Sequence, residues 1–342
     1  MLTRRQLFPM LILGGAVQCM RDPLHAQDGR KLYNSVARKS VQSGLKYLAS
    51  AQEENGTFGD GAYQDSTAII SLAGLSWLAS GSVPGRGPFG SVLRRCVDYV
   101  VAQSDSSGLI ASEAEQNKRP MYGHGFATLF LSQVYGMTRN PLVRTVLEKA
   151  VGLTLATQNS DGGWRYQPEK SDADISVTVC QAVALRGAVK SGFRVPPDTV
   201  LQCKSYLSKC QNPDGGFMYT HQGGESAFPR TGAALVGLFN CGIYEGDLVE
   251  QGLVFLDENW PEESEYSSSP HYFYGIYYAS HAYWQAGGER WSRWYKSIRD
   301  LLTDRQESDG NWRDEHVCNE YSTAMACLSL QMPNNHLPIL RR

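Results

Sequence analysis

The sequence lacks several features that would point to a common function. Its 32 Lys and Arg residues are balanced by 34 Asp and Glu residues, giving a formal charge of −2, and no basic stripe stands out. A nucleic-acid partner is therefore not expected, because proteins that bind nucleic acids carry clustered positive charge. The sequence also has no Gly-x-Ser-x-Gly nucleophile elbow and no Gly-Lys-Ser/Thr phosphate loop. The usual signatures of an α/β-hydrolase and of a nucleotide-binding loop are thus absent.

Cysteine pairing motifs are absent as well. The chain has eight cysteines, and none belongs to a Cys-x-x-Cys motif. Without Cys19, which lies in the N-terminal segment, the number is odd, and this argues against a disulfide framework or a zinc ribbon. We expect buried thiols, because a free Cys among apolar residues behaves as a small hydrophobe. Neither a metal ion nor another cofactor is predicted.

No hydrophobic run is long enough to predict a membrane-spanning helix. The uncharged stretch Gln6–Met20 follows the pair Arg4 and Arg5, and Leu24–Ala26 is a candidate cleavage site. This layout resembles a twin-arginine export signal. We therefore expect residues 1–27 to be a cleaved signal and the mature protein to be periplasmic or otherwise extracytoplasmic. Association with a membrane surface, including a lipid anchor on Cys19, is the alternative to full release.

What the sequence does contain is a repeated phrase, clearest at Gln158–Trp164, which reads Gln-Asn-Ser-Asp-Gly-Gly-Trp. Variants of this phrase begin at Gln52, Gln103, Gln211 and Gln306. The successive steps are 51, 55, 53 and 95 residues, and the last step leaves room for a degenerate copy near 256–260. Six units of about 50 residues predict a repeat architecture, which we place at residues 36–333 as one domain.

Each unit has an amphipathic stretch before the phrase and a more apolar stretch after it, both with helical spacing of the apolar residues. The amphipathic stretches are Val36–Ala51, Val92–Ala102, Leu142–Thr157, Val200–Cys210, Asp247–Leu256 and Arg293–Thr303. The apolar stretches are Asp65–Ala79, Tyr122–Tyr135, Asp174–Lys190, Thr231–Cys241, His271–Ala286 and Tyr321–Leu330. An apolar helix is buried, so we expect an all-α protein with an inner ring of six helices and an outer ring of six. An open solenoid is the alternative arrangement.

The phrase itself is expected to be structural. Its Asp-Gly-Gly permits a tight reversal, its aromatic residue covers the turn, and its Gln bonds free backbone groups at neighbouring helix ends. An aromatic and an aliphatic residue precede several of the glutamines, as in Tyr47-Leu48 and Tyr206-Leu207. With the Gln, Gly and aromatic residues that follow, this pattern resembles the repeat of the prenyltransferase and squalene oxidase superfamily. That group includes squalene–hopene cyclases, oxidosqualene cyclases and protein prenyltransferase β subunits, and it implies a closed α/α toroid.

In such a toroid the six inner helices all begin at one rim, where their N–H groups favour a carboxylate or phosphate. Class II terpene cyclases carry an Asp-x-Asp-Asp-Thr-Ala motif there, whose central Asp protonates an alkene. By this resemblance Asp172 matches the first Asp and Asp174 the proton donor, while Ile175 stands where the last Asp would be. The alternative for this stretch is helix capping, which uses the same residue types.

Ten other residues near the inner-helix starts are candidates for binding a substrate. The aromatic ones would line an apolar pocket and stabilise a carbocation through their faces. The candidates are Tyr122, His124, Phe126, Arg230, His271, Tyr272, Tyr274, Tyr278, Glu320 and Tyr321. They predict an apolar, isoprenoid-like ligand with an anionic head group.

Zinc is not expected. Protein prenyltransferases hold zinc with an Asp-x-Cys pair and a distant His, and His316-Val317-Cys318 lacks that spacing. Two functions follow from the sequence. The first is an isoprenoid enzyme that resembles a class II terpene cyclase, with Asp174 as its proton donor. The second is an exported binding or scaffold protein that keeps the toroid without the chemistry, its partner unknown.

Overall fold

A computed structural model of the protein describes residues 32–340, apart from 59–60 and 263. The predicted export signal at residues 1–27 and Cys19 lie outside this part of the chain. The described residues form α-helices with short 3₁₀ turns, and their β-structure consists of isolated bridges. None of the helices in this part of the chain is both long and apolar enough to cross a membrane.

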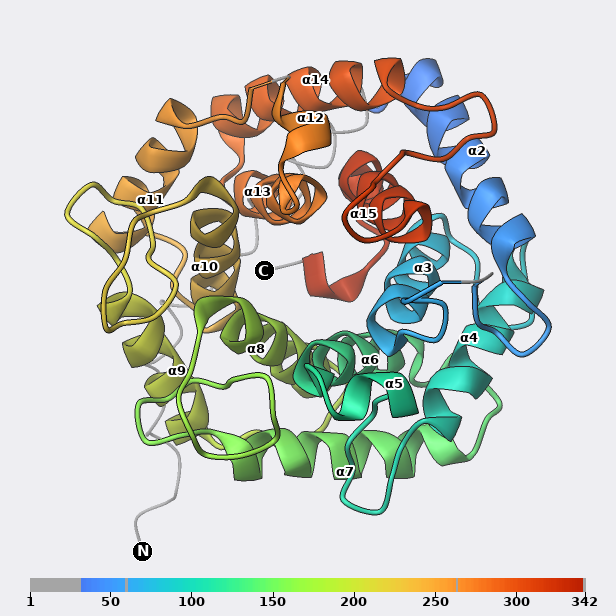
Figure 1. Cartoon of the computed structure of the whole chain (residues 1–342), viewed down its shortest axis with the longest axis horizontal. Helices are drawn as coiled ribbons and strands as arrows, with labels where there is room; N and C mark the ends of the chain where they lie inside the picture. The colour runs from blue at the N-terminus through green and yellow to red at the C-terminus, as the bar shows by residue number, and fades with distance from the viewer. Residues whose placement is uncertain (1–31, 59–60, 263, 341–342) are drawn as a thin grey trace, which may run out of the picture.

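Twelve of the helices in the described residues form two concentric rings (Figure 1). The outer ring holds α2 (Ser35–Ala51), α4 (Gly90–Ala102), α7 (Leu142–Thr157), α9 (Pro197–Lys209), α11 (Asp247–Glu258) and α14 (Gly288–Asp304). The inner ring holds α3 (Thr67–Ala79), α6 (Pro120–Val134), α8 (Ile175–Lys190), α10 (Phe228–Asn240), α13 (Tyr272–Ala286) and α15 (Asn319–Gln331). Each inner helix packs against the next, and α15 packs against α3. This closure confirms the predicted toroid and excludes the open solenoid.

The sequence places most helices within three residues of their ends, but it misses the shorter ones and one start. Helix α14 begins at Gly288, five residues before the predicted Arg293, because Gly287 ends α13 at a positive φ of 73° and α14 starts at once. The sequence pattern also gives no sign of four short elements. These are α5 (Glu113–Gln116), α12 (Glu265–Ser268), η2 (Met332–Asn334) and η3 (Pro338–Leu340).

The repeated phrase joins neighbouring repeats through its glutamine. The Gln158 side-chain amide donates to Gly162 O within its own turn at 2.9 Å and to Thr199 O near the start of α9 at 3.0 Å. The last copy closes the ring in the same way, because Gln306 donates to Gly310 O at 2.7 Å and to Ser40 O of α2 at 2.9 Å. Gln52 and Gln211 bond the next outer helix in the same way, so the phrase ties four of the six outer helices to their successors, including the last to the first.

The aromatic residue and the glycines of the phrase seal the turn. The Trp164 indole N–H donates to Thr154 O at 2.8 Å, and the ring is buried. Gly162 has a φ of 97°, and a Cβ there would meet the carbonyl oxygen of Gln202 on α9. Only glycine satisfies both conditions, so this position fixes how closely the outer helix approaches the turn.

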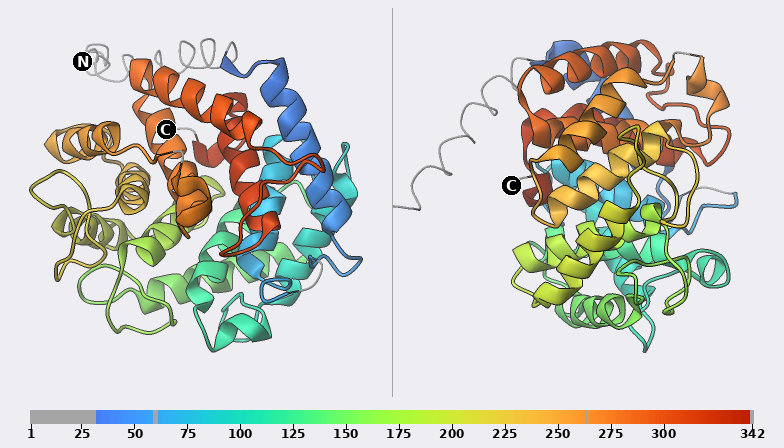
Figure 2. Two further views of the ribbon diagram at one scale, coloured as in Figure 1. Left: turned by 45° about the horizontal axis from the view of Figure 1, so that its top comes forward. Right: turned by 90° about the vertical axis from the view of Figure 1, so that its left-hand side faces the viewer.

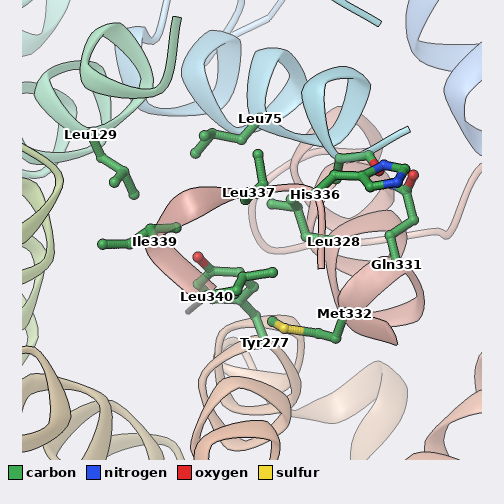
Figure 3. Close-up of a pocket in the computed structure, with 11 residues that line it drawn as sticks. Leu75, Leu129, Tyr277, Leu328, Gln331, Met332, His336, Leu337, Ile339 and Leu340 are labelled. Carbon is green, nitrogen blue, oxygen red and sulfur yellow. The ribbon is translucent and has the colours of Figure 1, made fainter. Parts of the chain in front are cut away.

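The C-terminal segment closes the end of the barrel at which the inner helices finish. Figure 1 shows the last described residues, in red, near the centre of the ring, and Figure 2 places them on the face opposite the long turns. The side chains of Leu337, Ile339 and Leu340 are buried there against the inner helices (Figure 3). The space left among them is about 10 Å³, roughly what one water molecule needs. This end of the barrel is filled.

Hydrogen bonds from the inner ring hold this segment. Gln133 accepts the Ile339 N–H at 3.2 Å, and Lys190 Nζ donates to Pro338 O at 2.8 Å. The side chains of Trp284 and Gln285 both donate to Leu340 O, at 3.2 and 2.8 Å. The segment is thus anchored by its backbone as well as by its apolar side chains, and it completes the core.

Candidate functional site

The candidate site lies at the other end of the barrel, which we call the mouth, where the inner helices begin. Asp174 is central to it. This residue precedes α8, and its Oδ1 accepts the Val177 N–H at 2.9 Å, which caps the helix. The Asp174 N–H donates to Trp164 O at 3.1 Å, so the repeated phrase positions the carboxylate directly. The residue is buried completely.

The second oxygen of Asp174 has no hydrogen bond of ordinary geometry, although the Ser176 N–H and the Tyr219 hydroxyl also act on the carboxylate. Its Oδ2 is buried without a hydrogen-bond partner and lies 3.7 Å from Arg165 Nε. Burial raises the pKa of Asp174 from 3.8 to about 6, while the Val177 N–H and the Arg165 charge oppose that rise. Because Oδ1 is occupied by the helix cap, Oδ2 is the atom that carries the proton when Asp174 is neutral.

Asp172 lies outside this buried position. It is exposed, and its Oδ2 pairs with Arg165 Nη1 at 3.1 Å. The Arg165 guanidinium therefore lies between the two carboxylates that the sequence singles out. Asp172 makes the shorter of the two contacts, so the two carboxylates share one guanidinium and Asp174 has the weaker part of it.

Two tyrosines and a second arginine extend this group, and the sequence analysis did not find them. The Arg165 guanidinium lies 4.7 Å from the ring centre of Tyr166 and 5.4 Å from that of Tyr219. Arg119, which precedes α6, lies 4.7 Å from the Tyr166 ring, and the hydroxyls of Tyr166 and Tyr219 are hydrogen-bonded. Both tyrosines come two residues after the aromatic residue of a repeated phrase, and this shared register was the signal available in the sequence.

Three inner-helix tyrosines form the aromatic side of the site. Tyr122 lies 6.0 Å from Tyr166 between ring centres, and Tyr274 lies 4.6 Å from Tyr278. Burial, followed by the Asp174 charge, raises the pKa of Tyr122. The side chains of Tyr122 and Tyr274 stay partly exposed although both lie on inner helices, so solvent reaches them at the mouth. Tyr278 is buried below them, with its hydroxyl 3.6 Å from Cys180 Sγ.

Positive charge gathers on another part of the mouth. Arg230, in the first turn of α10, is half-buried and donates from Nη2 to Glu225 O at 2.7 Å, while its Nε is buried without a partner. Burial lowers the pKa of Arg230. His271, at the start of α13, has its pKa lowered by burial and then by Arg230, His316 and Arg119. Three other basic side chains, each from a different segment, therefore act on His271 here.

Other predicted site residues lie away from this group. His124 is buried with both ring nitrogens occupied: Nδ1 accepts the Ile110 N–H at 3.2 Å, and Nε2 is 3.0 Å from Thr154 Oγ1. Burial lowers its pKa to about 4, so it is neutral. Glu320 accepts a hydrogen bond from Tyr47 of the outer ring at 2.9 Å.

The remaining three predicted binding residues, Phe126, Tyr272 and Tyr321, lie in three different surroundings. Phe126 is buried in the core, while Tyr272 packs edge-on against Tyr266 of α12. Tyr321 is partly exposed on α15 and lies close enough to Tyr274 for the ionisation of the two phenols to be linked. Among the described residues, no three His, Cys, Asp or Glu side chains are grouped closely enough to hold a metal ion. The structure therefore brings Asp174, Tyr122, Tyr274, Tyr278 and Tyr321 toward one end of the barrel.

No family model and no curated protein matches the chain. Solved structures with the same fold do. A variant of the type II terpene cyclase MstE from Scytonema, in complex with its substrate geranylgeranyl dihydroxybenzoate, matches with a TM-score of 0.63 at 12% identity, over 90% of this chain and 100% of its own. A protein from Actinoplanes matches with a TM-score of 0.60 at 14% identity, over 87% of this chain and 99% of its own.

A GH76 α-mannanase from Bacteroides thetaiotaomicron also matches, with a TM-score of 0.59 at 10% identity, over 87% of this chain and 96% of its own. The α/α toroid is thus shared by enzymes of different chemistry, so function must be argued from the site. The chain has the α/α-toroid fold that is found in a type II terpene cyclase.

Proposed function

We propose that the protein is an enzyme of the type II terpene cyclase kind, in which Asp174 donates a proton to an isoprenoid alkene at the mouth of the barrel. One observation carries the proposal. Asp174 is buried, burial raises its pKa to about 6, and its Oδ2 has no hydrogen-bond partner. A carboxylic acid must be kept protonated to act as a general acid, and these conditions favour the protonated form.

The neighbouring aromatic rings suit the charge that such a reaction creates. Protonation of an alkene by Asp174 Oδ2–H leaves a carbocation, and the faces of aromatic rings attract cations. Tyr122, Tyr274 and Tyr278 supply such faces from two inner helices. The reaction ends when a proton is lost, so the product is an isomer of the substrate with the same mass.

The basic side of the mouth suits a ligand with an anionic head group. Arg230 has a buried Nε without a partner, and His271, His316 and Arg119 surround the same region. A buried guanidinium N–H without an acceptor is costly, and a bound carboxylate or phosphate would accept from Arg230 Nε and offset that cost. A prenyl chain with an acidic head group fits both sides of the mouth.

The alternative is a binding protein without catalysis, and two observations favour it. Asp174 Oδ1 caps α8, which is a structural role in itself. The far end of the barrel is filled by residues 337–340, which limits the depth available to a ligand. Export directed by residues 1–27 is compatible with both proposed functions. Cell fractionation of the tagged full-length chain, with and without the double substitution Arg4→Lys/Arg5→Lys, would test it.

The decisive test uses geranylgeranoic acid, a prenyl chain with a carboxylate head. Purified wild-type protein is expected to convert it to an isomer of unchanged mass, detected by gas chromatography and mass spectrometry. The rate should fall as the pH rises above about 6, because the acid is then deprotonated. Asp174→Asn should bind the probe and return it unchanged, whereas Asp214→Asn, in the turn of the next repeat, should behave as wild type.

Binding of the head group is tested separately by native mass spectrometry. Arg230→Gln should weaken binding of geranylgeranoic acid by roughly tenfold or more, the size of one lost charge-assisted contact, and leave geranylgeraniol unaffected. If wild type and Asp174→Asn both retain the acid unchanged, the protein is a carrier. If neither probe binds, the proposed function is wrong and the toroid serves as a scaffold.

A further inference from the structure

Two cysteines face each other across the fourth repeat. Helices α9 and α10 run antiparallel, and Leu207 of α9 packs against Gly237 of α10, where a Cβ would lie 2.8 Å from Leu207 Cδ1. Cys203 lies one helical turn before Leu207, and Cys241 lies one turn after Gly237. Because the helices are antiparallel, these two steps lead in the same direction, so the two thiols come to lie opposite each other.

The two thiols are close enough for each to affect the ionisation of the other, and both are reduced in the structure. Other described cysteines have different partners. Cys96 Sγ lies 3.1 Å from Gln52 Nε2, Cys180 Sγ lies 3.6 Å from the Tyr278 hydroxyl, and Cys327 Sγ lies 3.9 Å from Val41 O. The contact between Cys203 and Cys241 is therefore a feature of this repeat and not a general consequence of buried cysteines.

Exposure differs between the two members of the pair. Cys203 is 1% exposed, whereas Cys241 follows the last residue of α10 and is partly exposed. The Cys241 thiol, followed by burial, holds the pKa of Cys203 well above its usual value. Since the thiolate is the reactive form, Cys203 is a slow nucleophile, and an oxidant reaches Cys241 first.

We propose that Cys203 and Cys241 form a disulfide when the protein meets a disulfide oxidant, and that this bond ties α9 to α10. With oxidised glutathione as the oxidant, the Cys241 thiolate attacks the glutathione disulfide and one glutathione leaves as a thiol. The Cys203 thiolate then attacks the Cys241 sulfur of the mixed disulfide, and the second glutathione leaves. The two cysteines are oxidised and lose one proton each, while the oxidant is reduced to two thiols.

The bond joins an outer helix to its inner partner at the end of the barrel away from Asp174. It is therefore independent of the proposed reaction and should leave the mouth unchanged. Disulfides persist in oxidising compartments and are reduced in the cytosol. The state of this pair in cells thus reports whether the mature protein has been exported, and it adds a covalent link after export.

The test treats the folded full-length protein with oxidised glutathione, alkylates the remaining thiols and maps the peptides by mass spectrometry. The expected result is a linked pair of peptides that contain Cys203 and Cys241, with two fewer alkylated cysteines than in the untreated protein. The melting temperature should rise on oxidation and return on reduction, because a cross-link restricts the unfolded chain.

Variants separate the steps. Cys203→Ser should stop at the mixed disulfide on Cys241, and Cys241→Ser should leave Cys203 as a thiol. Cys210→Ser removes a neighbouring thiol at the end of α9 and should leave the linkage intact. If Cys203 in the wild type is still fully alkylated after prolonged oxidation, or if it links to Cys210 instead, the proposal is wrong.

Discussion

The two ends of the barrel are built from the same six inner helices. They differ in whether the polar side chains near the helix ends are hydrogen-bonded. At the far end, the polar side chains Gln133, Lys190, Trp284 and Gln285 all bond the backbone of the C-terminal segment. At the mouth, Asp174 Oδ2 and Arg230 Nε are buried without partners. At the far end Gln331 Oε1 is also buried without a partner, but it belongs to a neutral amide, whereas the unpaired atoms at the mouth belong to ionisable groups. Leaving a charged group unsatisfied costs more stability than leaving a neutral one unsatisfied, and this difference favours the mouth as the place of the proposed function.

The largest expected effect comes from removing the C-terminal segment that closes the far end of the barrel. A chain that ends at Asn335 loses three buried apolar side chains, Leu337, Ile339 and Leu340. At about 1.5–3 kcal/mol for each, the free energy of unfolding should fall by roughly 5–9 kcal/mol. Urea unfolding followed by circular dichroism measures the loss.

Single substitutions provide the matched control for this truncation. Leu340→Ala removes a buried side chain and should cost about 2–4 kcal/mol. Leu201→Ala removes the same group at a site that is 59% exposed and should change stability by less than about 0.5 kcal/mol. Equal effects of the two substitutions, or a truncated chain as stable as the full one, would show that the segment is not part of the core.

The second prediction concerns Asp174 and the pH. Its pKa is raised from 3.8 to about 6 by burial, so the fold favours the protonated form. The resulting stability is fully present below pH 3.8 and is lost as the pH rises through 6. It amounts to about 3 kcal/mol, from about 1.4 kcal/mol for each pH unit.

Asp174→Asn keeps an acceptor for the Val177 N–H but cannot ionise. Between pH 4 and pH 7 the variant should therefore gain about 2.5 kcal/mol relative to wild type, because the carboxyl of the unfolded chain is already partly ionised at pH 4. Denaturant unfolding of both proteins at each pH gives the difference, in which the contributions of other groups cancel. A difference that stays constant with pH would mean that Asp174 is not held in its protonated form by the fold.

Much of the fold was predictable from the sequence, because the features that set it are local and repeated. The alternation of amphipathic and apolar stretches gave the two rings, and the Gly-rich phrase gave the turns. The same register also explains His124. Trp164 N–H donates to Thr178 Oγ1 and Phe217 N–H to Thr231 Oγ1, each 14 residues on, and Ile110 N–H donates to His124 in the same way. A comparison of the repeats would have identified this histidine as a structural substitute for threonine.

The site was less predictable, because its contacts join different repeats. Asp174 was found from its motif, but the place of Arg165 between Asp172 and Asp174 depends on how a turn folds back over α8. Glu320 was expected at the mouth, and the structure turns it toward Tyr47, which is 273 residues away. The burial of residues 337–340 could not be predicted, because a few apolar residues outside the repeats have no periodicity that distinguishes a core position from a surface position.

The smallest prediction uses two buried histidines with opposite surroundings. His124 is bonded at both nitrogens, whereas neither nitrogen of His281, on α13, has a hydrogen-bond partner among the described residues. His124→Leu leaves the Ile110 N–H unpaired and should cost about 1–3 kcal/mol at pH 7.5. His281→Leu removes two unpaired polar atoms at similar volume and should be neutral or stabilising by about 1 kcal/mol.

The pH adds a second, shared effect. Burial lowers the pKa of both histidines from 6.5 to about 4, so the fold favours their neutral forms. The associated stability is present above pH 6.5 and is lost as the pH falls through 4, because the unfolded chain takes up the proton first. Wild type should therefore lose stability relative to both leucine variants between pH 7 and pH 4. If His281→Leu is as destabilising as His124→Leu at pH 7.5, the His281 ring makes a hydrogen bond that stabilises the fold, and the contrast between the two histidines is wrong.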